Sequence, residues 1–233
     1  TTARKVAGGY RVSGTKHYAT NASLAEWLWI GRVASDSHPK PIMFMMHRDT
    51  PGLKIDCELW RPTGMRACVS PWLHLDDCFV PGENLLGKPG QFLEENWMGK
   101  INFAFTANYL GSARAMYEWA LDYIRERGGG KDSYRQLRFG ELKSMLDGAR
   151  LVLYTAVRMF KNDPAGAMVA AHEAKWLAKE TLQKMMWSTA EISGSTSLFD
   201  KHPLEPFYRD MHLHMMHGRH DIAAQIVGAA GLG

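Results

Sequence analysis

The chain has 233 residues and a formal net charge of +4, and 45% of its residues are hydrophobic. This length fits one large domain or two small ones with a substantial buried core, and the composition excludes a disordered chain. Lysines and arginines alternate with acids instead of clustering, so we expect no nucleic-acid partner. The longest apolar runs, such as Trp27–Ile30, are far too short to cross a bilayer.

The cysteines argue for a reducing compartment. Cys57, Cys68 and Cys78 are odd in number and lack CxxC spacing, which disfavours both a disulfide framework and a structural zinc site. We therefore expect the cytoplasm, or the mitochondrial matrix in a eukaryote. The chain shows no signal peptide and begins without Met close to a predicted strand, so we also expect an upstream portion.

Residues 1–88 have the pattern of a β domain. Short runs rich in aromatic and β-branched residues recur about every ten residues, with Gly and Pro between them. We expect a turn at Ser13-Gly14, directly after the first run. Such spacing favours a small barrel or sandwich. The predicted strands include Tyr10–Val12, Trp27–Val33, Ile42–Met46, Leu53–Ile55 and Trp72–Val80.

From about Gln91 onward the apolar residues recur at intervals of three and four, which indicates amphipathic helices. Three such stretches and the C-terminal segment predict a four-helix bundle. The breaks fall at Gly128–Gly130, Asn162–Pro164 and Gly194–Thr196, where turn-forming residues cluster. The predicted fold class is α+β: a β domain over residues 1–88, incomplete at its N-terminus, followed by a bundle over residues 89–233.

The stretch His202–Gly228 is where acid–base chemistry is expected. It holds five of the ten histidines, and histidine is the side chain most easily tuned to move protons near neutral pH. Taken singly, His212, His214 and His220 are interpreted as helix-surface or subunit-contact residues. For His217 a catalytic role and a surface role both stay open. A metal site of His214, His217 and Asp221 on one helix ranks below both, so no metal is predicted.

Five motifs in order resemble the acyl-CoA dehydrogenase family along nearly the whole chain. That family has a middle β-barrel and a C-terminal four-helix bundle. The resemblance implies that its N-terminal helical domain and the first barrel strands would precede Thr1, and that this chain alone would bind flavin weakly. The motifs are GTKHYATNA (14–22), GMRACVSPWLHLDDCFVPGENLLG (64–87), Leu110-Gly111 with Ala115 and Tyr123…Arg127, Glu191–Thr196, and Tyr208-Arg-Asp210.

The resemblance implies FAD as cofactor. Tyr18 and Thr20 match the family's residues beside the isoalloxazine ring. Arg127 is the nearest match, and Gln136 a weaker one, to the arginine that reaches a neighbouring subunit's FAD pyrophosphate. Gly194 matches the glycine turn that packs against the dinucleotide. Sharing a cofactor between subunits implies a homo-oligomer, and the family is usually tetrameric.

The activity implied by default is α,β-dehydrogenation of an acyl-CoA, with an electron-transfer flavoprotein as the reoxidising partner. The family's catalytic Glu is missing, however, because neither Met216–Arg219 nor Lys100–Asn108 contains one. His217 lies seven residues beyond Asp210, about where flavin monooxygenases of this fold carry a histidine, although Gly218 fits the Glu position equally well. The alternatives are a reduced-flavin-dependent monooxygenase using His217, and a non-catalytic paralogue or fragment. The substrate is not identified.

Overall fold

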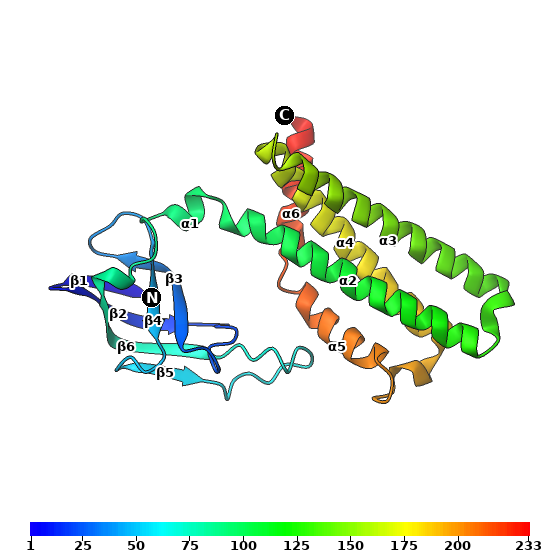
Figure 1. Ribbon diagram of the computed structural model, residues 1–233, viewed down its shortest axis with the longest axis horizontal. Helices are drawn as coiled ribbons and strands as arrows, with labels where there is room; N and C mark the ends of the chain where they lie inside the picture. The colour runs from blue at the N-terminus through cyan, green and yellow to red at the C-terminus, as the bar shows by residue number, and fades with distance from the viewer. The chain divides into compact units, whose positions relative to one another are not determined.

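The computed structural model describes residues 1–233 as two compact units, Thr1–Trp97 and Met98–Gly233. The first unit is a six-stranded sheet in the order β4-β3-β1-β2-β6-β5, curled into a half-barrel (Figure 1). Neighbouring strands are antiparallel, except that β1 and β3 pair in parallel. The strands are β1 (Thr2–Val6), β2 (Gly9–Lys16), β3 (Trp27–Ser35), β4 (Ile42–His47), β5 (Leu53–Asp56) and β6 (Trp72–Pro81), followed by η1 (Gly82–Asn84) and α1 (Gln91–Glu94).

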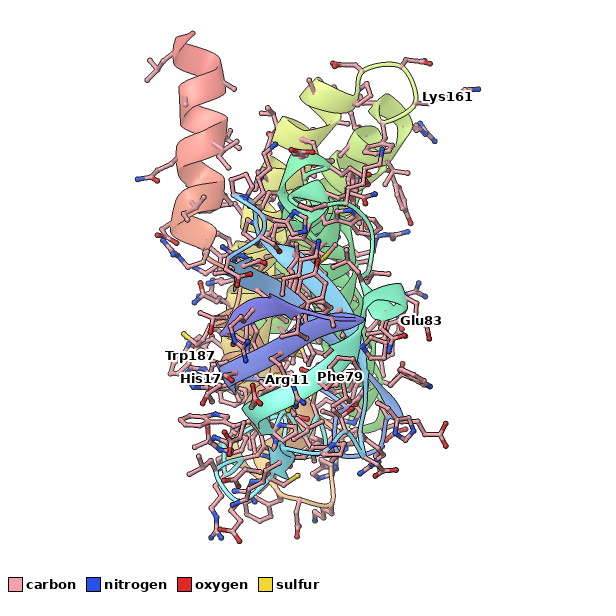
Figure 2. The ribbon with its side chains drawn as sticks, turned by 90° about the vertical axis from the view of Figure 1, so that its left-hand side faces the viewer. Arg11, His17, Phe79, Glu83, Lys161 and Trp187 are labelled. Atoms are coloured by element: carbon pink, nitrogen blue, oxygen red, sulfur yellow. The ribbon has the colours of Figure 1, made fainter.

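Alternation along the strands creates the core of this unit, because successive side chains in a strand point to opposite faces. Val12, Ile30 and Phe44 are fully buried in it. On the opposite face, the Arg11 guanidinium of β2 lies 5.5 Å from the ring centroid of Phe79 on β6. Figure 2 labels both side chains. The predicted strands are present; β2 is much longer than the Tyr10–Val12 that the sequence indicated, and the others are one or two residues longer.

The turn expected at Ser13-Gly14 is wrong. β2 continues to Lys16, and the register against β6 shifts between Val12 and Gly14, which marks a β-bulge. Gly14 has a φ of 125°, and a Cβ there would lie 2.8 Å from the Cα of Thr1. The glycine is thus required inside the strand, where the bulge and the neighbouring β1 leave no room for a side chain.

The second unit consists of long helices around one apolar core. These are α2 (Trp97–Glu126), α3 (Ser133–Met159), α4 (Pro164–Ser193), α5 (Leu204–Met215) and α6 (His220–Leu232), with short η2 (Gly129–Lys131) and η3 (Ser195–Leu198). α2 to α5 all contribute buried side chains to the core, among them Tyr109, Leu142, Leu182 and Met215. None of the helices combines the length and apolar character needed to span a membrane.

The predicted breaks between the long helices are confirmed, and each has a local cause. The Asp132 carboxylate accepts a hydrogen bond from the Arg135 amide at 2.8 Å and caps α3. Asp163 caps α4 in the same way through the Gly166 amide at 2.8 Å, with Pro164 in the first turn. Gly194, at a φ of 82°, ends α4.

The C-terminal segment is two helices, not the single fourth helix that the spacing predicts. α5 ends at Met215 and α6 begins at His220, and Arg219 between them has a left-handed φ of 43°. His217 therefore lies in a turn. His214 and Asp221 lie on different helices, so His214, His217 and Asp221 do not share one helix as the low-ranked metal site would require.

Candidate functional site

The residues singled out in the sequence fall in three places. Tyr18 and Thr20 lie in the β unit, on the segment that follows β2. Arg127, Gln136 and Gly194 lie at the end of the helical unit where α2 and α4 finish and α3 starts. His217 lies in the turn between α5 and α6.

Tyr18 and Thr20 line a cleft of about 470 Å³ in the β unit. Trp27 and Trp29 on β3 line the same cleft, and each is 50% exposed, so the cleft offers flat aromatic surfaces. Tyr18 is 64% exposed and has a left-handed φ of 61°. A strained backbone at an exposed aromatic residue is the kind of outlier that concentrates at binding sites.

The hydroxyl of Thr20 has a defined direction. Its Oγ1 lies 2.9 Å from Ser70 Oγ, and the Ser70 hydroxyl donates to the Cys68 carbonyl at 3.0 Å. A serine hydroxyl has one proton, so the Thr20 hydroxyl must be the donor to Ser70. The oxygen of Thr20 is then left able to accept a hydrogen bond from an N–H group of a ligand.

The cleft is also positively charged. Lys16 and Arg32 both line it, and Lys16 Nζ donates to the Arg32 carbonyl at 3.4 Å. Partial burial, and then the nearby Arg32 charge, lower the pKa of Lys16. Neither cation forms an ion pair, which leaves both available to an anionic ligand.

At the end of the bundle, Tyr123 brings Arg127 and the Gly194 turn together. The Arg127 guanidinium lies 3.6 Å from the ring centroid of Tyr123, and its Nη1 donates to the Tyr123 carbonyl at 3.3 Å. The Tyr123 hydroxyl lies 3.5 Å from Thr196 Oγ1, two residues beyond Gly194. Arg127 is exposed and pairs with no carboxylate, so its fork of donors can bind a phosphate.

Gln136 is held nearby in a different pocket. Its Nε2 donates to the Gly130 carbonyl at 2.9 Å. The side chain lines a cavity of about 280 Å³ together with Ile124, Arg135 and Phe139. Gln136 belongs to the first turn of α3 and therefore lies at the same end of the bundle as Arg127.

The turn at residues 216–219 presents His217 to solvent. Its Nδ1 lies 3.3 Å from the His214 carbonyl, which can only accept a hydrogen bond, so Nδ1 carries the proton in the neutral ring. The lone pair then sits on Nε2. Gly218 is buried, and a Cβ there would lie 2.3 Å from His220 Nε2. A side chain at position 218 would therefore have to displace the His220 ring, whereas His217 is exposed.

A buried polar network in the helical unit was missed by the sequence analysis. Lys175 on α4 is 6% exposed and donates to Asn102 Oδ1 at 2.9 Å, and Asn102 Nδ2 lies 3.2 Å from His172 Nδ1. Burial lowers the pKa of both Lys175 and His172. The signal was a lysine within the apolar stripe that includes Ala171, Ala174 and Ala178.

Comparison with known proteins identifies the family. Residues 103–230 match the family described as acyl-CoA dehydrogenase, C-terminal domain. The chain belongs to the acyl-CoA dehydrogenase family. As an acyl-CoA dehydrogenase family member, the chain has no glutamate in its α5–α6 turn, where His217 and Gly218 lie.

Individual relatives are distant. Cyclohex-1-ene-1-carbonyl-CoA dehydrogenase of Syntrophus aciditrophicus is 28% identical over 239 residues, covering 98% of this chain and 57% of the relative. The fold is shared with an acyl-CoA dehydrogenase from Bacillus anthracis complexed with FAD (22% identity, TM-score 0.86, 100% of this chain and 44% of that one). The fold is also shared with dibenzothiophene monooxygenase from Paenibacillus sp. A11-2, at 22% identity and a TM-score of 0.87. That match covers 97% of this chain and 66% of the monooxygenase chain. This family chain thus spans little more than half the length of such curated relatives.

Proposed function

We propose that this protein is an FAD-dependent oxidoreductase that uses His217, and not a carboxylate, as its acid–base residue. The observation that carries the proposal is the turn at residues 216–219. It exposes an imidazole with its Nε2 lone pair free, while a side chain at Gly218 would meet the His220 ring. Asp221, the nearest acid in sequence, is engaged by Arg219 at 3.0 Å.

The residues present fit FAD. The aromatic cleft with Tyr18 and the accepting Thr20 oxygen suits a planar ring that carries N–H groups. The unpaired Arg127 beside the Gly194 turn suits a pyrophosphate, and Gln136 adds an amide at the same end of the bundle. When bound, FAD would supply a two-electron acceptor.

The first candidate reaction is dehydrogenation of an acyl-CoA, which the relatives' activities support. In this reaction His217 Nε2 would remove the proton α to the thioester, and the hydride from the β-carbon would go to the two-electron acceptor that FAD would supply. The imidazolium that forms keeps its Nδ1–H hydrogen bond to the His214 carbonyl. An electron-transfer flavoprotein would be the partner that takes up the electrons.

The second candidate reaction is monooxygenation with reduced flavin. The observation that favours it is the imidazole itself, because a dehydrogenase of this family is expected to place a glutamate here. His217 would then shuttle a proton during oxygen transfer. A non-catalytic role is the remaining alternative, and it requires that replacement of His217 has no kinetic effect.

Replacement of His217 tests the proposal. His217→Ala in the full-length protein should lower turnover by about 10²–10⁴, because general acid–base help is worth that much, while flavin content stays unchanged. Arg127→Ala should instead lower the flavin content, and turnover should fall with it. His212→Ala, at an exposed position on α5, is the matched control and should leave both properties unchanged.

The assay also separates the two reactions. A dehydrogenase should bleach its flavin when acyl-CoA is added without oxygen. A monooxygenase should ignore acyl-CoA and consume oxygen only when reduced flavin is supplied. A His217→Ala variant that is silent in both assays would rule out the catalytic role.

We further propose that the protein is a homo-oligomer assembled through its helical unit. Large apolar side chains are exposed on the outer helices, including Leu151 and Val157 on α3 and Trp176 and Trp187 on α4. Leu151 and Trp187 are each 65% exposed. Assembly would cover this surface, and it is compatible with Arg127 serving the cofactor of a neighbouring subunit.

A further inference from the structure

The turn between α5 and α6 is not held by local sequence preference alone. Arg219 adopts a φ of 43°, a region that L side chains rarely occupy. Its ion pair with Asp221 joins side chains that are 69% and 63% exposed, and exposed pairs contribute little. Another contact must therefore keep residues 216–219 in this conformation.

His220 supplies that contact in two ways. Its Nε2 lies 3.0 Å from the Met215 carbonyl, so Nε2 carries the proton and donates to the last residue of α5. Its ring also fills the space beside Gly218, where a Cβ would lie 2.3 Å from Nε2 and 2.5 Å from Cε1. One imidazole thus satisfies a helix-end carbonyl and packs against the middle of the turn.

Tyr109 connects this arrangement to the bundle core. It is fully buried on α2, and its ring centroid lies 5.7 Å from that of His220 and 5.2 Å from that of His214. The Tyr109 hydroxyl donates to the His214 carbonyl at 3.5 Å, the same carbonyl that receives His217 Nδ1. The orientation of His217 is therefore tied to a fixed core residue.

We propose that His220 is a positioning residue, which holds the turn so that His217 projects with its Nε2 outward. The effect of His220 on turnover rests on the proposed function, but its effect on the conformation of the turn does not. Burial is the largest influence on the pKa of His220, and it lowers that pKa. The charges of Lys175 and Lys179 also lower the pKa, whereas the hydrogen bond to Met215 and the charge of Glu180 raise it. The ring therefore stays neutral over more of the acidic range, and its Nδ1, buried without a partner, stays unprotonated.

Two substitutions at His220 separate its two contacts in the full-length protein. His220→Phe keeps a ring beside Gly218 but removes the donor to Met215. His220→Gln keeps an N–H donor of similar reach. The exposed His212→Phe on α5 is the control for adding an aromatic ring.

We expect His220→Phe to speed amide hydrogen exchange at Gly218, whose N–H donates to the Met215 carbonyl, about fivefold, the equivalent of one lost hydrogen bond. It should also lower kcat with KM and flavin content unchanged, and displace the pH profile of kcat, because His217 is no longer fixed. His220→Gln should restore exchange to within twofold of the wild-type rate, and His212→Phe should change neither exchange nor kcat.

Exchange in His220→Phe that matches the wild-type rate overturns the inference, whatever the kinetics. If exchange is faster in His220→Phe but His217→Ala has no kinetic effect, the catalytic role of His217 is overturned. The role of His220 in stabilising the turn is then still supported. If His220→Phe does not fold, His220→Gln decides: wild-type exchange supports the inference, and fivefold faster exchange overturns it.

Discussion

Replacing Gly218 by alanine tests the packing of the α5–α6 turn directly. Gly218 does not have a positive φ, so the backbone accepts alanine and only the His220 ring opposes the new methyl group. Overpacking typically costs about 1–3 kcal/mol. Displacing the ring also breaks its hydrogen bond to Met215, at about 1 kcal/mol. Gly218→Ala should therefore lower the free energy of unfolding by about 2–4 kcal/mol.

Urea denaturation followed by far-ultraviolet circular dichroism measures this loss, since the signal comes mainly from the helices. In a His220→Ala background the ring is absent, so the same Gly218→Ala change should cost less than about 0.5 kcal/mol. Gly148→Ala on α3 is the matched control: a Cβ there meets no atom within 4 Å, and alanine should stabilise the helix by up to about 1 kcal/mol. An equal cost of Gly218→Ala in both backgrounds would refute the reasoning.

Two further predictions concern the buried lysine and the exposed helix face. Because burial lowers the pKa of Lys175 below 10.5, the unfolded chain binds more protons at alkaline pH, and wild-type stability should rise as the pH climbs from the folded pKa toward 10.5. Lys175→Met should lack this rise. If the free energies of unfolding of the wild type and of Lys175→Met ran parallel from pH 7 to pH 10, the lowered pKa of Lys175 would be contradicted. Leu151→Glu combined with Trp187→Glu should shift the assembly to smaller species in light scattering, whereas Lys161→Glu at the α3–α4 turn (Figure 2) should not. A wild-type protein that is already monomeric at micromolar concentration would remove the basis for the oligomer.

Local sequence determined most of the secondary structure. Short dense runs of aromatic and aliphatic residues were sufficient for β3 and β4. Spacing of three and four gave α2, α3 and α4, and the pair Asp163-Pro164 marked a helix start, since capping is a contact within one turn. The sequence also drew attention to Tyr18, Thr20, Arg127 and Gly194, and their roles toward FAD remain predictions.

The tertiary structure decided features that depend on neighbours distant in the chain. Gly14 indicated a turn by itself, but pairing of β2 with β1 and β6 makes it a bulge, because β2 is hydrogen-bonded on both sides. Lys175 had the spacing of a core position, and only Asn102, 73 residues away, explains how its amine is accommodated.

The α5–α6 turn shows the same limit at the candidate site. Helical spacing runs through His217 and Gly218 without a proline, so the sequence favours one continuous helix there. Contacts of the His220 ring with Gly218, with the Met215 carbonyl and with Tyr109 stabilise a break instead. Helix propensities differ by less than about 1 kcal/mol per residue. Packing and hydrogen bonds at a buried position are worth more than that, so the core determines where the helix ends and where His217 projects.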